Sequence, residues 1–182
     1  IHITNLDKIM IAQVPVVDGK SAVEGDFSID GVPGTGAKIS LDWADVVGGT
    51  TGKLLPTGNA KDVIKYNGKE YHASIVDAGT ISVFVRAEEL GMAGTESPQE
   101  IEANKDLLEL MEIIRGKACE LIGLVDHWED SMKETPYLPF LVTVAKPTDY
   151  VCFTGKKVLA KDVDLVARLS SMGIINKTFA GS

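Results

Sequence analysis

Short turns rich in glycine, threonine, asparagine and serine are the residues of this sequence most suited to binding a small anion. Such turns direct several backbone N–H groups to one point, and these groups can hold a carboxylate without a basic side chain. Each turn could equally be an ordinary hairpin or crossover turn, and that alternative weakens if several of them meet in one cleft. The turns are residues 34–36, Thr57-Gly58-Asn59, Gly79-Thr80 and Gly181-Ser182.

Other motifs for chemistry are weaker. Residues 48–53 (Gly-Gly-Thr-Thr-Gly-Lys) only partly match a phosphate-binding P-loop, because Val47 stands where its first glycine belongs and Leu54 follows Lys53. The three histidines are scattered, and we expect Cys119 and Cys152, both in apolar surroundings, to be core residues. No acid/base pair, nucleophile or metal-ligand spacing is visible. The sequence therefore predicts no metal or other cofactor.

The charge balance limits the partners. The chain has 182 residues, with 18 Lys and Arg against 26 Asp and Glu, for a net charge of −8. This charge disfavours nucleic acid and anionic membrane surfaces as partners. The longest apolar runs, 9–17 and 138–145, are too short to span a bilayer. Two isolated cysteines suit a reducing compartment, and we expect the cytoplasm.

Two dipeptides, Asp18-Gly19 and Asn67-Gly68, predict β-hairpins. The first joins residues 8–17 to 21–29, and the second joins 62–66 to 69–76. Apolar or β-branched runs predict further strands at 39–43, 81–87, 138–146, 150–153, 157–159 and 163–169.

One long helix is expected between the two sets of strands. Ser97-Pro98-Gln99-Glu100 forms a capping box, with proline at the first helical position. Apolar residues then recur at 3.6-residue spacing from Ile101 to Ile122. The order of strands, helix and strands argues against a doubly wound parallel sheet. It predicts a single α/β (α+β) domain over residues 1–182, with a mostly antiparallel, barrel-like sheet wrapped around a central helix.

Three stretches carry a family likeness: 31–39 together with Gly-Lys-Leu-Leu-Pro-Thr-Gly-Asn at 52–59, the segment 76–91 beginning Val-Asp-Ala-Gly, and Gly-Thr-Glu-Ser-Pro at 94–98. They resemble the PrpF family, which includes 2-methylaconitate cis-trans isomerases, methylitaconate isomerases, 4-oxalomesaconate tautomerases and FldA-like proteins. The resemblance implies a fold like that of diaminopimelate epimerase, with two similar domains and an active site between them. It also implies that this chain is the second domain of a longer protein, whose first, catalytic domain and final segment lie outside the sequence.

The resemblance implies an isomerase or tautomerase without a cofactor, which moves a proton and the C=C bond in small unsaturated di- or tricarboxylic acids. The lysine and cysteine that carry this chemistry in the family have no match here, so the catalytic residues are expected outside this chain. The chain would supply the other wall of the site through Thr57, Gly58, Asn59, Gly79 and Thr80. Gly181 and Ser182 resemble the small-residue turn of the family that faces the substrate, and Ser182 is the residue most expected near it.

Two departures from the family pattern bear on the substrate. Thr80-Ile81 stands where relatives often have Asn-Pro, and Asn176-Lys177 stands where they often carry a histidine. Other readings stay open: a non-catalytic domain that binds a carboxylate or a partner protein, and a racemase or epimerase, which would need a cysteine where Ser182 stands. A homodimer is also open. On the isomerase reading, the isolated chain should be inactive.

Overall fold

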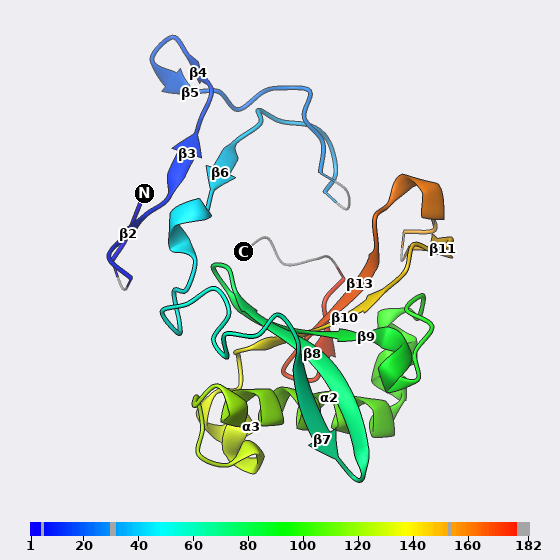
Figure 1. The fold of residues 1–182 in the computed structure, drawn as a ribbon. Coiled ribbons are helices and arrows are strands. Elements are labelled where there is room, and N and C mark those ends of the chain that lie inside the picture. Colours follow the sequence, from blue (N-terminus) through cyan, green and yellow to red (C-terminus); the bar gives the residue numbers. More distant parts are fainter. Residues whose placement is uncertain (5, 30–31, 153, 178–182) are drawn as a thin grey trace.

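The computed structural model describes residues 1–4, 6–29, 32–152 and 154–177. Its main feature is a six-stranded sheet in the order β14-β13-β10-β9-β8-β7 (Figure 1). All neighbouring pairs are antiparallel except β9 and β10, which are parallel. The strands are β7 (Asp62–Tyr66), β8 (Lys69–Asp77), β9 (Ile81–Arg86), β10 (Phe140–Ala145), β13 (Val166–Ser171) and β14 (Ile174–Ile175).

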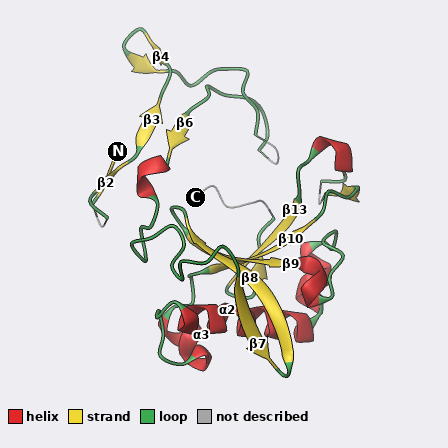
Figure 2. Ribbon diagram, in the orientation of Figure 1, coloured by secondary structure: helices red, strands yellow, loops and turns green. Residues whose placement is uncertain are grey.

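Helix α2 covers one face of this sheet (Figure 2). Its buried residues Leu107, Met111, Ile114 and Ala118 follow helical spacing, and they pack on alternate residues of β8 and β9 such as Ile75 and Val83. The helices are α1 (Pro98–Ala103), α2 (Lys105–Leu121) and α3 (Ser131–Glu134), with 3₁₀ turns η1 (Ala44–Val46), η2 (Ala87–Leu90), η3 (Trp128–Asp130) and η4 (Ala160–Asp162).

The sequence predicts much of this fold. The Asn67-Gly68 hairpin is confirmed, since β7 and β8 pair across it, and both turn residues have the positive φ that this turn needs. The mixed, mostly antiparallel sheet is also confirmed. It is an open sheet with β14 and β7 at its edges, so the expected barrel-like closure is not seen among the described residues.

The prediction of one unbroken helix was wrong. The capping box on Ser97 and Glu100 forms as expected, but α1 ends at Ala103. Asn104 leaves the helical conformation, with φ −90° and ψ 91°, and its side-chain oxygen accepts a hydrogen bond from the Leu107 amide. Asparagine is a strong N-cap residue, and here it starts a second helix within an apolar pattern that runs through both.

The first part of the chain forms only short strand pairs, two or three residues in each strand. The Asp18-Gly19 hairpin is confirmed, but the runs 8–17 and 21–29 are not continuous strands. The pairs are β1 (His2–Ile3) with β2 (Lys8–Ile9), β3 (Ile11–Gln13) with β6 (Ser40–Asp42), and β4 (Val16–Val17) with β5 (Lys20–Ser21); later in the chain β11 (Tyr150–Val151) pairs with β12 (Lys157–Val158).

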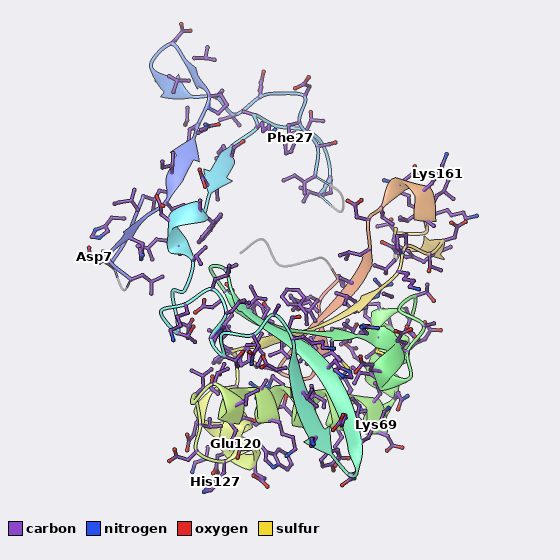
Figure 3. All side chains as sticks on the ribbon, viewed as in Figure 1. Asp7, Phe27, Lys69, Glu120, His127 and Lys161 are labelled. Atoms are coloured by element: carbon purple, nitrogen blue, oxygen red, sulfur yellow. The ribbon has the colours of Figure 1, made fainter. Side chains whose placement is uncertain are left out.

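The chain from residue 1 to residue 42, here called the N-terminal segment, lies apart from the six-stranded sheet (Figure 1). Its side chains are drawn in Figure 3, and many of the apolar ones are exposed. Val23 is 83% exposed and Val16 is 63% exposed, and Phe27 also faces outward. Exposed apolar side chains gathered in one segment mark a surface suited to contact with another part of a protein.

Arg115 fixes the segment between α3 and β10. It is 2% exposed, and it donates from Nε and Nη2 to the Glu112 carboxylate and from Nη1 to the carbonyl oxygens of Thr135 (2.9 Å) and Leu138 (3.1 Å). The next residue, Gly116, passes so close to η3 that an added Cβ would lie 2.7 Å from the Trp128 carbonyl oxygen.

Replacing Arg115 with methionine should lower the free energy of unfolding by about 3 kcal/mol, because Glu112 loses its ion-pair partner and the Thr135 and Leu138 carbonyls lose the hydrogen bonds from Arg115. Arg86→Met is the matched control, since the Arg86 side chain is 62% exposed and its ion pairs with Glu88 and Glu89 should contribute less than about 1 kcal/mol. Urea denaturation of the intact protein measures both values. Equal losses for the two variants would contradict this role of Arg115.

Candidate functional site

Three of the glycine- and threonine-rich segments gather at one end of the sheet. Residues 57–59 precede β7, the turn at 78–80 joins β8 to β9, and residues 48–53, here called the 48–53 loop, lie beside the end of β8. The Gly48 amide donates to the Asp77 carbonyl (2.7 Å), and the Asp77 amide donates to the Leu54 carbonyl (2.9 Å). Further along, the Ser74 hydroxyl donates to the Ala60 carbonyl. The chain from 48 to 60 therefore runs along β8.

Asp62 organises the turn at 57–59. This residue, the first of β7, is buried, and its carboxylate accepts hydrogen bonds from the Thr57 hydroxyl (2.8 Å) and the Asn59 side-chain amide (3.0 Å). The Thr57 hydroxyl also accepts a bond from the Asn59 backbone amide. These side chains hold the turn itself together, so their hydrogen bonds explain the Thr-Gly-Asn motif without a substrate.

Asp77, the last residue of β8, organises the 48–53 loop in the same way. Its side chain is fully buried, and its Oδ2 accepts hydrogen bonds from the Thr50 amide (2.9 Å), the Thr51 amide (2.7 Å) and the Thr51 hydroxyl (3.0 Å). No sequence motif assigns a role to Asp62 or Asp77. The signal available was an aspartate at the start or end of a strand next to a threonine and glycine turn.

Gly79 has φ 109°, a conformation that favours glycine, and it lies near the Trp43 ring. Gly79 and Thr80 are partly buried, next in the chain to the Asp77 clamp. The structure thus brings Gly79 and Thr80 to the same end of the sheet as Thr57, Gly58 and Asn59.

Residues 34–36 lie instead on the N-terminal segment, where Gly36 pairs with Phe27. The predicted Gly181 and Ser182 lie outside the described residues.

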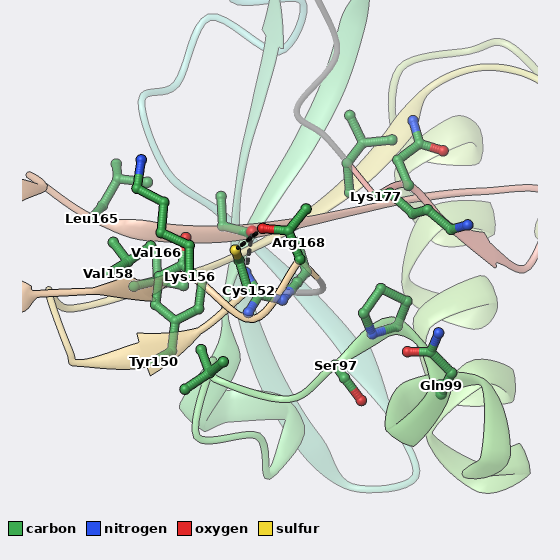
Figure 4. A pocket seen from close by; sticks show the side chains of 16 residues that line it. Ser97, Gln99, Tyr150, Cys152, Lys156, Val158, Leu165, Val166, Arg168 and Lys177 are labelled. Atoms are coloured by element: carbon green, nitrogen blue, oxygen red, sulfur yellow. Dashed lines mark hydrogen bonds between the residues drawn. The ribbon is translucent and has the colours of Figure 1, made fainter. Parts of the chain in front are cut away.

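A separate cavity of about 560 Å³ lies between the β11–β12 hairpin, β13 and the start of α1 (Figure 4). Its described lining has three basic residues and no acidic one, and it includes none of Thr57, Gly58, Asn59, Gly79 and Thr80. Polar and basic residues of the lining include Ser97, Tyr150, Cys152, Lys156, Arg168 and Lys177.

Arg168 is held in place within this cavity. Its Nε donates to the Glu96 carbonyl (2.8 Å), its Nη1 donates to the Ala167 carbonyl (2.9 Å), and its guanidinium lies 5.1 Å from the centre of the Tyr150 ring. A fixed guanidinium without a carboxylate partner among the described residues suits a carboxylate ligand. No sequence pattern points to this site, because Tyr150 and Arg168 lie on β11 and β13, which pair with other strands, and the two side chains meet only in the folded chain.

The two thiols differ. Cys119 is fully buried on α2, as predicted, and burial raises the pKa of its thiol to about 11. The prediction of Cys152 as a core residue was wrong. Its side chain lines the cavity, its Sγ lies 3.0 Å from the Thr154 hydroxyl, and hydrogen bonds with Thr154 lower its pKa. The β11–β12 hairpin is too short to bury it.

Metal-binding clusters and membrane-spanning helices are both absent from the described residues. No cluster of three or more His, Cys, Asp or Glu side chains is arranged to hold a metal ion in that part of the chain. Within the same residues, no helix combines the length and the apolar character needed to cross a membrane.

A family profile and individual protein sequences both match nearly the whole chain. The profile of the family described as PrpF protein matches residues 1–182. The chain is 45% identical to the 3-methylitaconate isomerase of Eubacterium barkeri, over 100% of this chain and 48% of that protein. It is 35% identical to the 2-methyl-aconitate isomerase of Shewanella oneidensis, over 98% of this chain and 46% of that protein.

A solved structure also matches. The crystal structure of a methylitaconate-delta-isomerase superposes with a TM-score of 0.93 at 44% identity, and the match covers 99% of this chain and 47% of that one. The chain therefore spans about half the length of the curated relatives it matches.

At about pH 8, iodoacetamide should alkylate Cys152 and leave Cys119 unmodified in the folded protein, because the thiolate is the reactive form. The raised pKa keeps Cys119 protonated, and the lowered pKa of Cys152 favours its thiolate. Peptide mass spectrometry after a short exposure measures both sites, and Cys152→Ser supplies the control in which labelling disappears. Faster labelling of Cys119 would contradict the assignment.

Proposed function

This chain belongs to the PrpF protein family, and from that premise we propose that it forms part of an isomerase of small unsaturated di- or tricarboxylic acids. The observation that carries the proposal is the match to methylitaconate-delta-isomerase, with a TM-score of 0.93 at 44% identity over 99% of the chain. A likeness this complete includes the loops and turns that surround the end of the sheet as well as the sheet itself.

A methylitaconate-type acid is the proposed substrate. Identity is 45% to the 3-methylitaconate isomerase, compared with 35% and 32% to two 2-methyl-aconitate isomerases. A 4-oxalomesaconate tautomerase from Pseudomonas putida is 41% identical, but over 63% of this chain. Methylitaconate, a branched dicarboxylate with a movable double bond, is therefore the first compound to test, followed by methylaconitate and oxalomesaconate.

The proposed reaction is a proton shift. A base removes a proton from a carbon next to the C=C bond, the electron pair of that C–H bond forms the new double bond, and an acid returns a proton to the other end of the allylic system. Atoms and electrons balance without an oxidant or reductant, so the reaction requires no redox cofactor. The negative charge that develops spreads onto a substrate carboxylate, where fixed N–H donors stabilise it.

In this proposal the chain forms one wall of the active site. The Gly79–Thr80 turn and the neighbouring turn at 57–59 face the substrate, together with Gly181 and Ser182. The acid and base belong to the part of the protein beyond this chain. The exposed apolar side chains of the N-terminal segment support the proposal that another part of the protein packs against this segment. Without such a contact, these apolar side chains would be exposed to water. We assign the protein to the cytoplasm, a compartment that suits the two free cysteines.

A second candidate function is carboxylate binding without turnover. The basic cavity around Arg168 favours it, since its described lining holds no acidic residue. Calorimetric titration of the intact protein with the same acids separates the two candidates: binding without isomerisation would support this one.

If the proposed reaction is right, the intact protein will exchange the allylic hydrogens of methylitaconate for deuterium in D₂O and convert the acid to its isomer. Proton NMR follows both changes in one sample. Citrate, which has no C=C bond, is the control and should show neither change. The absence of exchange into methylitaconate, methylaconitate and oxalomesaconate would exclude the activity.

The 182-residue chain by itself should be inactive, because the proposed acid and base are not among its residues. The measurement is the same NMR assay on the isolated chain, after circular dichroism has shown that it is folded. Turnover by the folded chain alone would place the acid and base within these residues and would overturn the proposed division of roles.

A further inference from the structure

The 48–53 loop has the form of an anion-binding nest. The consecutive amides of Thr50 and Thr51 point to one oxygen, at 2.9 and 2.7 Å, and the Thr51 hydroxyl adds a third donor at 3.0 Å. The loop closes tightly, since a Cβ added to Gly48 would lie 2.6 Å from the Lys53 nitrogen. Such loops commonly hold an anion from solution, but this one already holds the carboxylate of Asp77.

Asp77 also joins the loop to the neighbouring turn. Its backbone bonds to Gly48 and Leu54 on one side, and it forms the last pair of the β8–β9 ladder, with Ile81, on the other. Only residues 78–80 lie between these paired residues. The position of the Gly79–Thr80 turn is therefore coupled to the position of the loop through one residue.

We propose that Asp77 is the positioning residue of the candidate site: its carboxylate fills the nest of the 48–53 loop from within and so fixes the Gly79–Thr80 turn against which the substrate binds. This inference rests on the proposed function for its catalytic consequence. Its structural part, the internal carboxylate in the nest, stands on the geometry alone.

Asp77 does not act as the acid or base. Its side chain is fully buried, so it does not touch a substrate bound at the turn. Its Oδ2 accepts all three bonds, while its Oδ1 is also buried and has no hydrogen-bond partner among the described residues. One acceptor oxygen is therefore enough for the clamp, and an asparagine side chain has one.

This geometry separates a positioning role from a catalytic one. Asp77→Asn keeps an acceptor oxygen and the side-chain shape, so kcat should stay within about threefold of wild type. Asp77→Ala leaves the nest empty and frees the turn, and displacement of a substrate-binding group by an ångström can lower kcat by about 100-fold. A carboxylate that transferred a proton would lose activity in both variants.

The vacated nest allows a direct test by chemical rescue. In Asp77→Ala, formate should occupy the position of the missing carboxylate and restore part of kcat, whereas chloride at the same ionic strength should not. Hydrogen exchange at the Thr50 and Thr51 amides is the readout that needs no activity: exchange should quicken in Asp77→Ala, and formate should slow it again.

Asn104→Ala is the control. The Asn104 side-chain oxygen also accepts a backbone amide, that of Leu107 (3.1 Å), but at the start of α2 and away from both candidate sites. Its removal should lower thermal stability without changing the kcat of the folded protein. If Asp77→Ala fails to fold, Thr51→Val provides the test, because it removes one donor and should lower kcat several-fold while Thr50 remains bound.

The outcomes distinguish the two proposals. If the wild-type protein isomerises none of the acids, the proposed function fails, and amide exchange still decides whether the carboxylate fills the nest. Wild-type kcat in Asp77→Ala, or equal losses in the alanine and asparagine variants, would overturn the positioning role. Unchanged exchange at Thr50 and Thr51 would overturn the clamp itself.

Discussion

Two buried carboxylates, those of Asp62 and Asp77, determine the course of the chain over one end of the sheet. A buried carboxylate is costly unless donors surround it, and here the donors are amides and hydroxyls of residues 48–59. The chain must therefore lie where these bonds can form. The glycine- and threonine-rich composition of this segment follows from the same need, since small residues let backbone amides approach a single oxygen.

The remaining structure separates stability from function. The apolar face of α2 and the alternating residues of β8 and β9 form a core on one side of the sheet, and Arg115 fixes the segment between α3 and β10. The turns at the end of the sheet contribute little to that core.

The two candidate sites differ in how they would bind an anion. At the end of the sheet the described donors of residues 50–51 and 57–59 bind the chain's own carboxylates, Asp77 and Asp62, which hold the turns in place. In the cavity beside β13 the main donor is the Arg168 guanidinium, oriented by two carbonyls and the Tyr150 ring. Fixed backbone donors suit the stabilisation of charge during a reaction, and a basic cavity suits the capture of a charged ligand.

By itself, the sequence determined the features that depend on neighbouring residues. Asn67-Gly68 gave the hairpin, Ser97 and Glu100 gave the start of the first helix, and the motifs at 52–59 and 76–91 gave the family. Tertiary structure alone decided that Cys152 faces a cavity and that Asp77 fills the nest of a loop 24 or more residues earlier in the chain. Turns and caps form through local hydrogen bonds, whereas burial and long-range partners depend on how distant segments pack, which no local pattern records.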